Sequence, residues 1–263
     1  MKIRHLILLL TFFSFLSATA YFSHQMTSPK QLTGNHEETI TKKEVSYFED
    51  ETVYAEEKAC EKGTMQSPIQ IESADVVRKQ APSIRFSYGE EQLGLVKQKH
   101  TLEAVSKSNL NFITIDNEQY KFESFHFHQP SEHQIEGQSH DMELHLVHKN
   151  EKGELAVVAV FIQSGKENDM IKEVWKFLKD ETLKEKEYEA FNLLQFIPEE
   201  KTAYYYEGSL TTPPCTEGVR WIIFENPIEF SKDQIALFSK FYGNNNRPLQ
   251  PANGREIIKI SVK

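Results

Sequence analysis

From about Cys60 onward the chain is a succession of short runs rich in β-branched and aromatic residues, and this pattern constrains the fold more than any other feature. The runs include "SIRFSY", "NFITI", "LAVVAVFI" and "VRWIIF", separated by glycine, asparagine and aspartate. The runs favour extended backbone and the separators favour turns, so strands should dominate. Two segments, "ITIDNEQYKF" and "VHKNEKGELAVV", place polar turn residues between such runs and predict hairpins.

Two segments have helical periodicity instead. Asn168 can cap the first, whose apolar residues recur three and four positions apart: Ile171, Val174, Trp175 and Leu178. Ser231 and Gln234 form a capping box ahead of the second, which carries the apolar residues Ile235, Phe238 and Phe241 and is followed by Gly243. Both apolar stripes predict helices that pack against a core.

The N-terminal part has a different character. Residues 1–20 contain two basic residues, an apolar stretch from Leu6 to Leu16 and the small-x-small sequence Ala18-Thr19-Ala20, which together predict a secretory signal cleaved before Tyr21. The apolar stretch is shorter than a membrane span needs, so we expect no stable membrane insertion, a retained anchor being the alternative. Residues 21–57 are polar and predict a flexible tether ahead of a single domain at 58–263.

The charge balance excludes some partners. The 263 residues include 39 acidic and 30 basic ones, and the predicted signal removes two of the basic residues. The exported chain is therefore more acidic than the formal net charge of −9 for the whole sequence. Because phosphate backbones and anionic lipids attract basic proteins, we expect no nucleic-acid partner. We expect a secreted protein, extracellular or periplasmic.

Cys60 and Cys215 are the only cysteines, and both follow the predicted signal. Disulfides persist in oxidising compartments, so an exported chain with two cysteines predicts one disulfide between them. Two buried free thiols are the alternative.

Histidines in two strand-like runs suggest chemistry. In "SFHFHQP", residues 124–130, alternation along a strand places Ser124, His126 and His128 on one face and two phenylalanines on the other. In "MELHLVH", residues 142–148, the same alternation places Glu143, His145 and Val147 together. Antiparallel pairing of the two strands would bring the three histidines onto one face.

Three neutral imidazoles and one open position are a ligand set for catalytic zinc, with water in the fourth position. Glu143 can accept the ring N–H of His145 that does not face the metal, and Ser124 has the same positional relation to His126. An isolated His-x-His pair is only suggestive of metal. "HFHQPSE" also matches a cupin pattern, in which Glu132 would bind iron or manganese, although the Pro-x-Gly turn of the second cupin motif is missing before His145.

Four stretches together resemble the α-class carbonic anhydrases of the exported bacterial type: "QSPIQI" (66–71), "FHFHQPSEH" (125–133), "ELHLVH" (143–148) and "YEGSLTTPPCTEGVRWIIF" (206–224). They occur in the family's order, and the similarity covers roughly Cys60 to Lys263. The resemblance implies an α+β, mainly β single domain with a large twisted, mostly antiparallel central sheet and peripheral helices. It also implies reversible hydration of carbon dioxide to bicarbonate and a proton, by attack of zinc-bound hydroxide.

The resemblance assigns roles residue by residue. His126, His128 and His145 match the zinc ligands. Thr211 matches the threonine that orients the nucleophile and donates a hydrogen bond to Glu132, and Thr212 follows it as a polar contact on the substrate side. The apolar wall that receives carbon dioxide corresponds to Val147, Val157, Leu210, Val219 and Trp221.

The remaining matches concern protons and support. His100 lies at the position of the family's proton shuttle, and Asn245, with Arg247, matches the C-terminal segment that supports a zinc histidine. Cys60 and Cys215 match the disulfide of exported bacterial members. The implied partners are carbon dioxide, bicarbonate and sulfonamide inhibitors, and the chain is expected to be a monomer or a homodimer.

The sequence departs from the family at several positions. The aromatic "WGY" and "GPxxW" segments are replaced by "YFEDETVYAEEKAC", and Ser124 replaces a glutamine. Gln98 and Glu103 stand where asparagine or glutamine is usual. A catalytically silent relative that serves as a binding module is therefore the alternative function, and a cupin-type oxygenase is a third.

Overall fold

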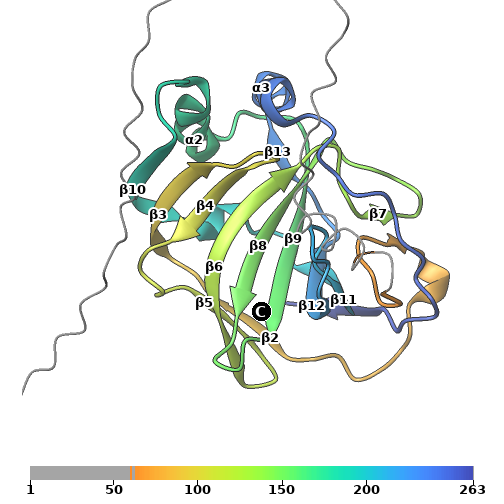
Figure 1. The fold of residues 1–263 in the computed structure, drawn as a ribbon. Helices are drawn as coiled ribbons and strands as arrows, with labels where there is room; N and C mark the ends of the chain where they lie inside the picture. Colours follow the sequence, from red (N-terminus) through yellow and green to blue (C-terminus); the bar gives the residue numbers. More distant parts are fainter. Residues whose placement is uncertain (1–59, 61–62, 263) are drawn as a thin grey trace, which may run out of the picture. The chain divides into compact units, whose positions relative to one another are not determined.

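In the computed structural model, which describes residue 60 and residues 63–262, twelve strands form one sheet (Figure 1). Along its main path the strands are β10 (Glu185–Asn192), β3 (Glu90–Lys97), β4 (Leu102–Ser106), β6 (Glu118–His128), β8 (Met142–Lys149), β9 (Leu155–Ser164), β12 (Glu217–Phe224), β11 (Thr202–Ser209) and β14 (Ile258–Ser261). Beside this path β2 (Ile84–Ser87) pairs with β5 (Phe112–Ile115), β5 pairs with β6, and β13 (Ile228–Phe230) pairs with β9. Strands β1 (Gln70–Ile71) and β7 (Gln134–Ile135) form a separate pair.

The strand directions confirm the expected fold class. Within the large sheet only the pairs that β9 makes with β12 and β13 are parallel, and the other pairs are antiparallel. Both predicted hairpins are present, β5–β6 and β8–β9. In the first hairpin Asp116 and Asn117 have φ values of 48° and 71°, a left-handed conformation that these two residue types tolerate.

The helices have the predicted caps. Helix α2 (Asp169–Lys179) begins after Asn168, whose side chain accepts a hydrogen bond from the amide of Ile171. Helix α3 (Lys232–Tyr242) begins with the predicted capping box of Ser231 and Gln234. It ends at Gly243, where an added Cβ would lie 2.7 Å from the carbonyl oxygen of Ser239. Two 3₁₀ turns, η1 (Ser73–Asp75) and η2 (Leu193–Phe196), are also present.

Two hydrophobic clusters divide the core. The larger contains Phe125, Phe127, Leu144 and Leu146 together with the apolar faces of α2 and α3. For example, the Phe127 ring lies 5.2 Å from Trp175 of α2 and 5.9 Å from Phe238 of α3, centroid to centroid. The smaller cluster contains Val157, Val219 and Trp221. The alternation predicted for β6 and β8 is confirmed, because their phenylalanine and leucine side chains lie in the larger cluster.

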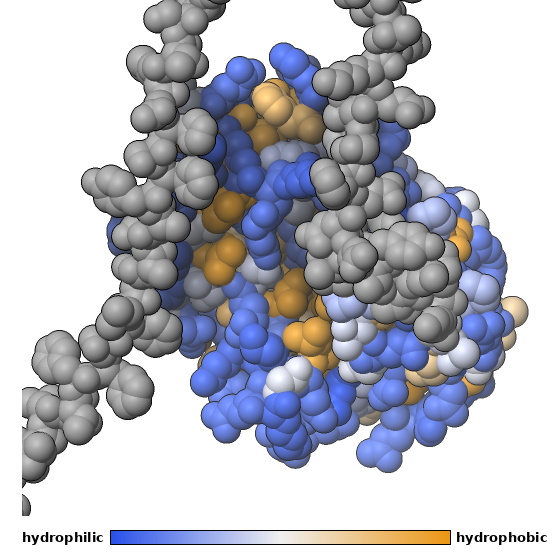
Figure 2. All heavy atoms as spheres, in the orientation of Figure 1, coloured by the Kyte–Doolittle hydropathy of each residue, from blue (hydrophilic) through white to orange (hydrophobic). Residues whose placement is uncertain are grey.

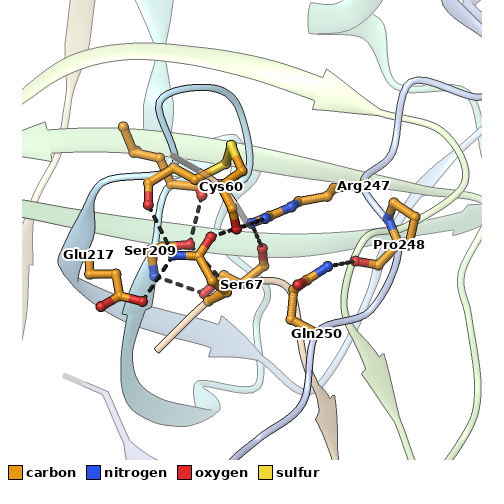
Figure 3. Close-up of a disulfide and its surroundings, with 10 residues drawn as sticks. Cys60, Ser67, Ser209, Glu217, Arg247, Pro248 and Gln250 are labelled. Atoms are coloured by element: carbon orange, nitrogen blue, oxygen red, sulfur yellow. Dashed lines mark hydrogen bonds between the residues drawn. A yellow bond between two sulfur atoms is a disulfide. The ribbon is translucent and has the colours of Figure 1, made fainter. Parts of the chain in front are cut away.

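A disulfide joins Cys60 and Cys215 across 155 positions of sequence, as predicted (Figure 3). The predicted signal at 1–20 and the tether at 21–57 lie outside the described residues. Among the residues that the structure describes, none of the helices is long and apolar enough to cross a membrane. The surface in the view of Figure 2 is mainly hydrophilic, with separate hydrophobic patches between the polar side chains.

Candidate metal centre

Three histidines converge on one face of the sheet. Strands β6 and β8 pair in a register that places His126 directly opposite His145, and His128 follows His126 by two residues on the same face. One ring nitrogen from each of the three histidines lies within 4.8 Å of the others. We call the face of the sheet that carries these residues the histidine face.

Two of the three rings are oriented by neighbours that leave one nitrogen free. His128 Nδ1 lies 3.2 Å from the backbone oxygen of Asn245, and His128 Nε2 is buried without a hydrogen-bond partner. His145 Nε2 lies 2.7 Å from Glu143 Oε1, which leaves Nδ1 of that ring available. A buried nitrogen without a partner is costly unless a ligand occupies it, so this donor set fits a metal ion that accepts imidazole, such as zinc.

The third ring is less supported. Ser124 lies on the histidine face opposite Val147, as alternation predicts. No hydrogen bond joins Ser124 to His126 among the described residues. The support of His126 by Ser124 therefore stays a prediction.

Burial favours neutral imidazoles at this site. The pKa of His126 is held well below its ordinary value by burial, with further lowering by His128 and His145. Burial also lowers the pKa of His128, and Glu132 opposes that effect. Because a neutral imidazole is the form that binds a metal, the lowered pKa values of His126 and His128 favour the binding-competent form of these two rings.

Glu143 holds together the inner side of the site. It is fully buried and also accepts the backbone amides of Glu132 and His133, each at 2.8 Å. Burial alone would raise the pKa of Glu143, but the neighbouring His133 and His145 outweigh burial and lower it. A buried carboxylate with this many donors fixes the position of the His145 ring.

His133 is a functional neighbour that the sequence reasoning missed. Its ring is fully buried, with Nδ1 2.7 Å from Glu143 Oε1 and Nε2 2.7 Å from the hydroxyl of Tyr206. That hydroxyl in turn lies 2.7 Å from Ser67 Oγ. His133, Glu143 and His145 also satisfy the spacing of a metal site, but hydrogen bonds already link their ligand atoms. We therefore assign them to a hydrogen-bonded chain that supports the metal centre.

Glu132 lies beside the site as a carboxylate held by the backbone. Its Oε1 accepts the amide of Arg247 at 2.7 Å, and its Oε2 is buried and has no hydrogen-bond partner. It is not among the groups whose ligand atoms cluster with the histidines, which disfavours the cupin arrangement. The predicted hydrogen bond from Thr211 to Glu132 is not formed in the described structure, although both side chains are buried.

The five predicted wall residues all belong to the smaller hydrophobic cluster or contact it. Cross-strand pairing aligns Val147 of β8 with Val157 of β9, and Val157 with Trp221 of β12. The Trp221 ring lies 4.9 Å from the His145 ring, centroid to centroid. Val219 is buried and Leu210 is half-buried, whereas Thr212 is exposed.

His100 lies outside the cluster of ligands. It is exposed, in the turn between β3 and β4, and its carbonyl oxygen accepts the side-chain amide of Asn245 at 2.9 Å. The same amide also donates to the carbonyl of Phe127. Asn245 thus connects the turn that carries His100 to the ligand His128.

Arg247 supports the loop after Thr211. Its guanidinium donates to the carbonyl oxygens of Cys60 and Ser67 and to the side chain of Gln66 (Figure 3). The Gln66 amide in turn donates to the carbonyl of Cys215 at 3.1 Å. The disulfide and these hydrogen bonds together attach the Thr211 loop to the first part of the domain.

Sequence and structure comparisons agree with this geometry. The family model described as eukaryotic-type carbonic anhydrase matches residues 49–261. The carbonic anhydrase of Klebsiella pneumoniae is 38% identical over 207 residues, which cover 78% of this chain and 83% of that protein.

Two solved structures are similar over most of the chain. The α-carbonic anhydrase of Thermovibrio ammonificans, in complex with the inhibitor sulfanilamide, is 37% identical with a TM-score of 0.70, covering 74% of this chain and 87% of that one. The α-carbonic anhydrase of Photobacterium profundum is 35% identical with a TM-score of 0.71, covering 76% and 92%.

Fold and site together define a mainly β protein whose central sheet carries three converging histidines that could hold a metal ion. The chain belongs to the α-class carbonic anhydrase family, which confirms the resemblance found in its motifs.

Proposed function

We propose that this protein holds one zinc ion through His126, His128 and His145 and catalyses the reversible hydration of carbon dioxide to bicarbonate and a proton. The observation that carries this proposal is the convergence of three ring nitrogens within 4.8 Å in a member of this family. When bound, zinc would supply a Lewis acid that lowers the pKa of a coordinated water from about 15.7 to about 7.

Glu143 and Asn245 have orienting roles in this proposal. Each occupies the second nitrogen of one ligand ring, Glu143 that of His145 and Asn245 that of His128. Fixing the tautomer leaves the other nitrogen of each ring as a lone-pair donor. A ligand held in one orientation does not lose rotational freedom when the metal binds.

Glu132 and Thr211 orient the reacting water. Glu132 Oε2 is a buried acceptor without a donor, and a hydroxyl proton from Thr211 would satisfy it. A threonine hydroxyl has a single proton. Once it donates that proton in a hydrogen bond to Glu132, the hydroxyl oxygen can only accept hydrogen bonds from other groups. The Thr211 hydroxyl would then accept a hydrogen bond from the reacting water, which would direct a lone pair of the water oxygen toward carbon dioxide.

The wall of Val147, Val157, Leu210, Val219 and Trp221 suits the substrate. Carbon dioxide has no net dipole, so an apolar surface beside the metal can hold it without hydrogen bonds. Thr212 is exposed next to Thr211 and would contribute a polar contact at the rim.

His100 would pass the released proton to buffer. Its exposure and the connection of its turn to His128 through Asn245 support this role. Replacing His100 with alanine should lower turnover, and added imidazole buffer should restore it. A turnover unchanged by this substitution would remove His100 from the mechanism.

The setting is also part of the proposal. The disulfide supports export to an oxidising compartment, extracellular or periplasmic. Sulfonamides should inhibit the enzyme, since the Thermovibrio ammonificans relative binds sulfanilamide. We propose a monomer or a homodimer as the assembly.

Stopped-flow hydration of carbon dioxide by protein with one bound zinc tests the function. The wild type should hydrate carbon dioxide above the buffer rate and be inhibited by sulfanilamide, and His145→Ala should lose both zinc and activity. His148→Gln is a matched control, because this histidine lies on the same strand but on the opposite face and should keep its zinc. A zinc-loaded wild type without hydration would instead support the silent binding module.

A further inference from the structure

One acidic side chain shares the histidine face and has no part in the chemistry described above. Glu103 of β4 pairs directly with His126 of β6, and His126 pairs directly with His145 of β8. Directly paired residues of neighbouring strands project to the same face with Cβ atoms about 4.5–5.5 Å apart. Glu103 is therefore the first neighbour of a metal ligand in the cross-strand row.

The charge of Glu103 is not neutralised by its surroundings. Its carboxylate accepts only a hydrogen bond from the amide of Gln98 at 3.3 Å. Within the described part of the chain no lysine, arginine or histidine forms an ion pair with it. Lys99, four positions before Glu103 in the turn, is exposed. Lys97, at the end of β3, bonds the carbonyl of Asp180 and lies over the Phe177 ring, 4.8 Å from its centroid.

The rest of the row offers no compensating cation either. On the other side of Glu103 the row continues through Val96 of β3 to Glu185 of β10. Beyond His145 it continues to Ala159 of β9. Glu103 is half-buried, so its field reaches the histidines with less screening than a fully exposed charge would have.

We propose that Glu103 is a specificity-determining residue whose negative charge weakens the binding of anions at the metal centre, bicarbonate included, and leaves the binding of neutral carbon dioxide unchanged. This inference rests on the proposed function of the same site. Its physical basis is that a unit charge acts on an anionic ligand and not on an uncharged one. The consequence for the enzyme is weaker retention of its own product and weaker inhibition by anions in the medium.

The test compares zinc-loaded wild type with Glu103→Gln, which keeps the shape of the side chain and removes its charge. Calorimetric titrations use three benzenesulfonamides that share one metal-binding group and carry a para-carboxy, para-methyl or para-aminomethyl substituent. The affinity ratio of the carboxy to the methyl compound should rise about twofold to twentyfold in Glu103→Gln, as Coulomb's law gives for charges about 9 Å apart at an effective dielectric of about 80 to 20. The affinity ratio of the aminomethyl to the methyl compound should be lower in Glu103→Gln than in wild type.

A matched control removes the same charge elsewhere. Glu189 of β10 also accepts a hydrogen bond from one glutamine amide, that of Gln92, and lies at the edge strand of the sheet. Glu189→Gln should leave both ratios unchanged. Bicarbonate should inhibit carbon dioxide hydration with a lower inhibition constant in Glu103→Gln than in wild type or Glu189→Gln.

The outcomes separate the two proposals. Sulfonamide binding with ratios that are equal in wild type and Glu103→Gln would overturn the role of Glu103 and leave the proposed function standing. Equal changes of the affinity ratios in Glu103→Gln and Glu189→Gln would also overturn the role of Glu103, since the net charge of the protein alone would then explain the effect. A zinc-loaded wild type that binds none of the three compounds would overturn the proposed function and this inference with it.

Discussion

At the scale of single residues, the three ligand histidines differ in how firmly they are held. His128 and His145 each have a partner for the nitrogen that does not face the metal, whereas His126 has none among the described residues. Ser124, its neighbour on the same face, has a side chain too short to replace the glutamine usual in the family. The ring of His126 should therefore be the least well oriented ligand.

Lengthening that side chain should strengthen the site. In Ser124→Gln the amide can reach the free nitrogen of His126, and partners of this kind are worth about 10- to 100-fold in metal affinity. We expect zinc affinity to rise about tenfold, measured by competition with a chelator. Ser124→Ala measures the predicted support by the serine hydroxyl, and its loss of affinity should be much smaller than the gain in Ser124→Gln. A tenfold loss in Ser124→Ala would show that the serine already supports the ring as well as a glutamine could.

Substitutions of the two buried glutamates, Glu132 and Glu143, should have different effects on the hydration rate and on zinc affinity. Glu132→Gln removes the carboxylate that accepts the proposed hydrogen bond from the Thr211 hydroxyl. The rate of carbon dioxide hydration should therefore fall on the order of 100-fold, with zinc content unchanged. Glu143→Gln should instead lower zinc affinity about 10- to 100-fold, because this carboxylate holds a ligand ring. Stopped-flow rates and metal analysis on both variants check this, and the reverse pattern would exchange their roles.

At the scale of secondary-structure elements, local rules explain what the sequence could predict. Alternation along β6 and β8 separated ligands from core residues, and the caps of α2 and α3 followed from side chains within four positions of each other. His133 could not be found in this way. Its partners Tyr206 and Glu143 come from different strands, and only the sheet order β8, β9, β12, β11 brings them together.

The hydrogen-bonded chain through Tyr206 should contribute to stability. Tyr206→Phe leaves the buried nitrogen of His133 and the hydroxyl of Ser67 without their shared partner, which should cost about 1–3 kcal/mol in the free energy of unfolding. Urea denaturation measures this loss. Tyr204→Phe is the control, because the Tyr204 hydroxyl bonds Glu225 in a partly exposed position, and it should cost much less.

At the scale of the whole molecule, a buried histidine outside the site should shape the dependence of stability on pH. Burial lowers the pKa of His148 to about 3, and its Nε2 lies 2.6 Å from the hydroxyl of Tyr88. Unfolded imidazole takes up a proton near pH 6.5, so the unfolded chain binds more protons between about pH 3 and about 6.5. The stability from this group is complete above that range and is lost as the pH falls through it.

Removing this group should flatten the pH profile. Between about pH 6 and about pH 4 the free energy of unfolding should fall less steeply in His148→Gln than in wild type. The two slopes should differ by at most about 1.4 kcal/mol per pH unit, the contribution of one titrating group. Both proteins are compared without zinc by urea denaturation at several pH values, so that metal loss does not contribute. Parallel curves for the two proteins would contradict the prediction.

The bond between Cys60 and Cys215 also determines how mechanical force would pass through the chain. Tension between the two termini enters at Cys60, crosses the disulfide and leaves through Cys215, which bypasses residues 61–214. The three histidines, Glu132, Glu143 and Thr211 all lie inside that bypassed stretch. Strand β12, helix α3 and the segment with Asn245 and Arg247 lie outside it. A pull on the N-terminus would therefore load the segment with Asn245 and Arg247 along the covalent chain, and it would reach the three histidines only through hydrogen bonds for as long as the disulfide is intact.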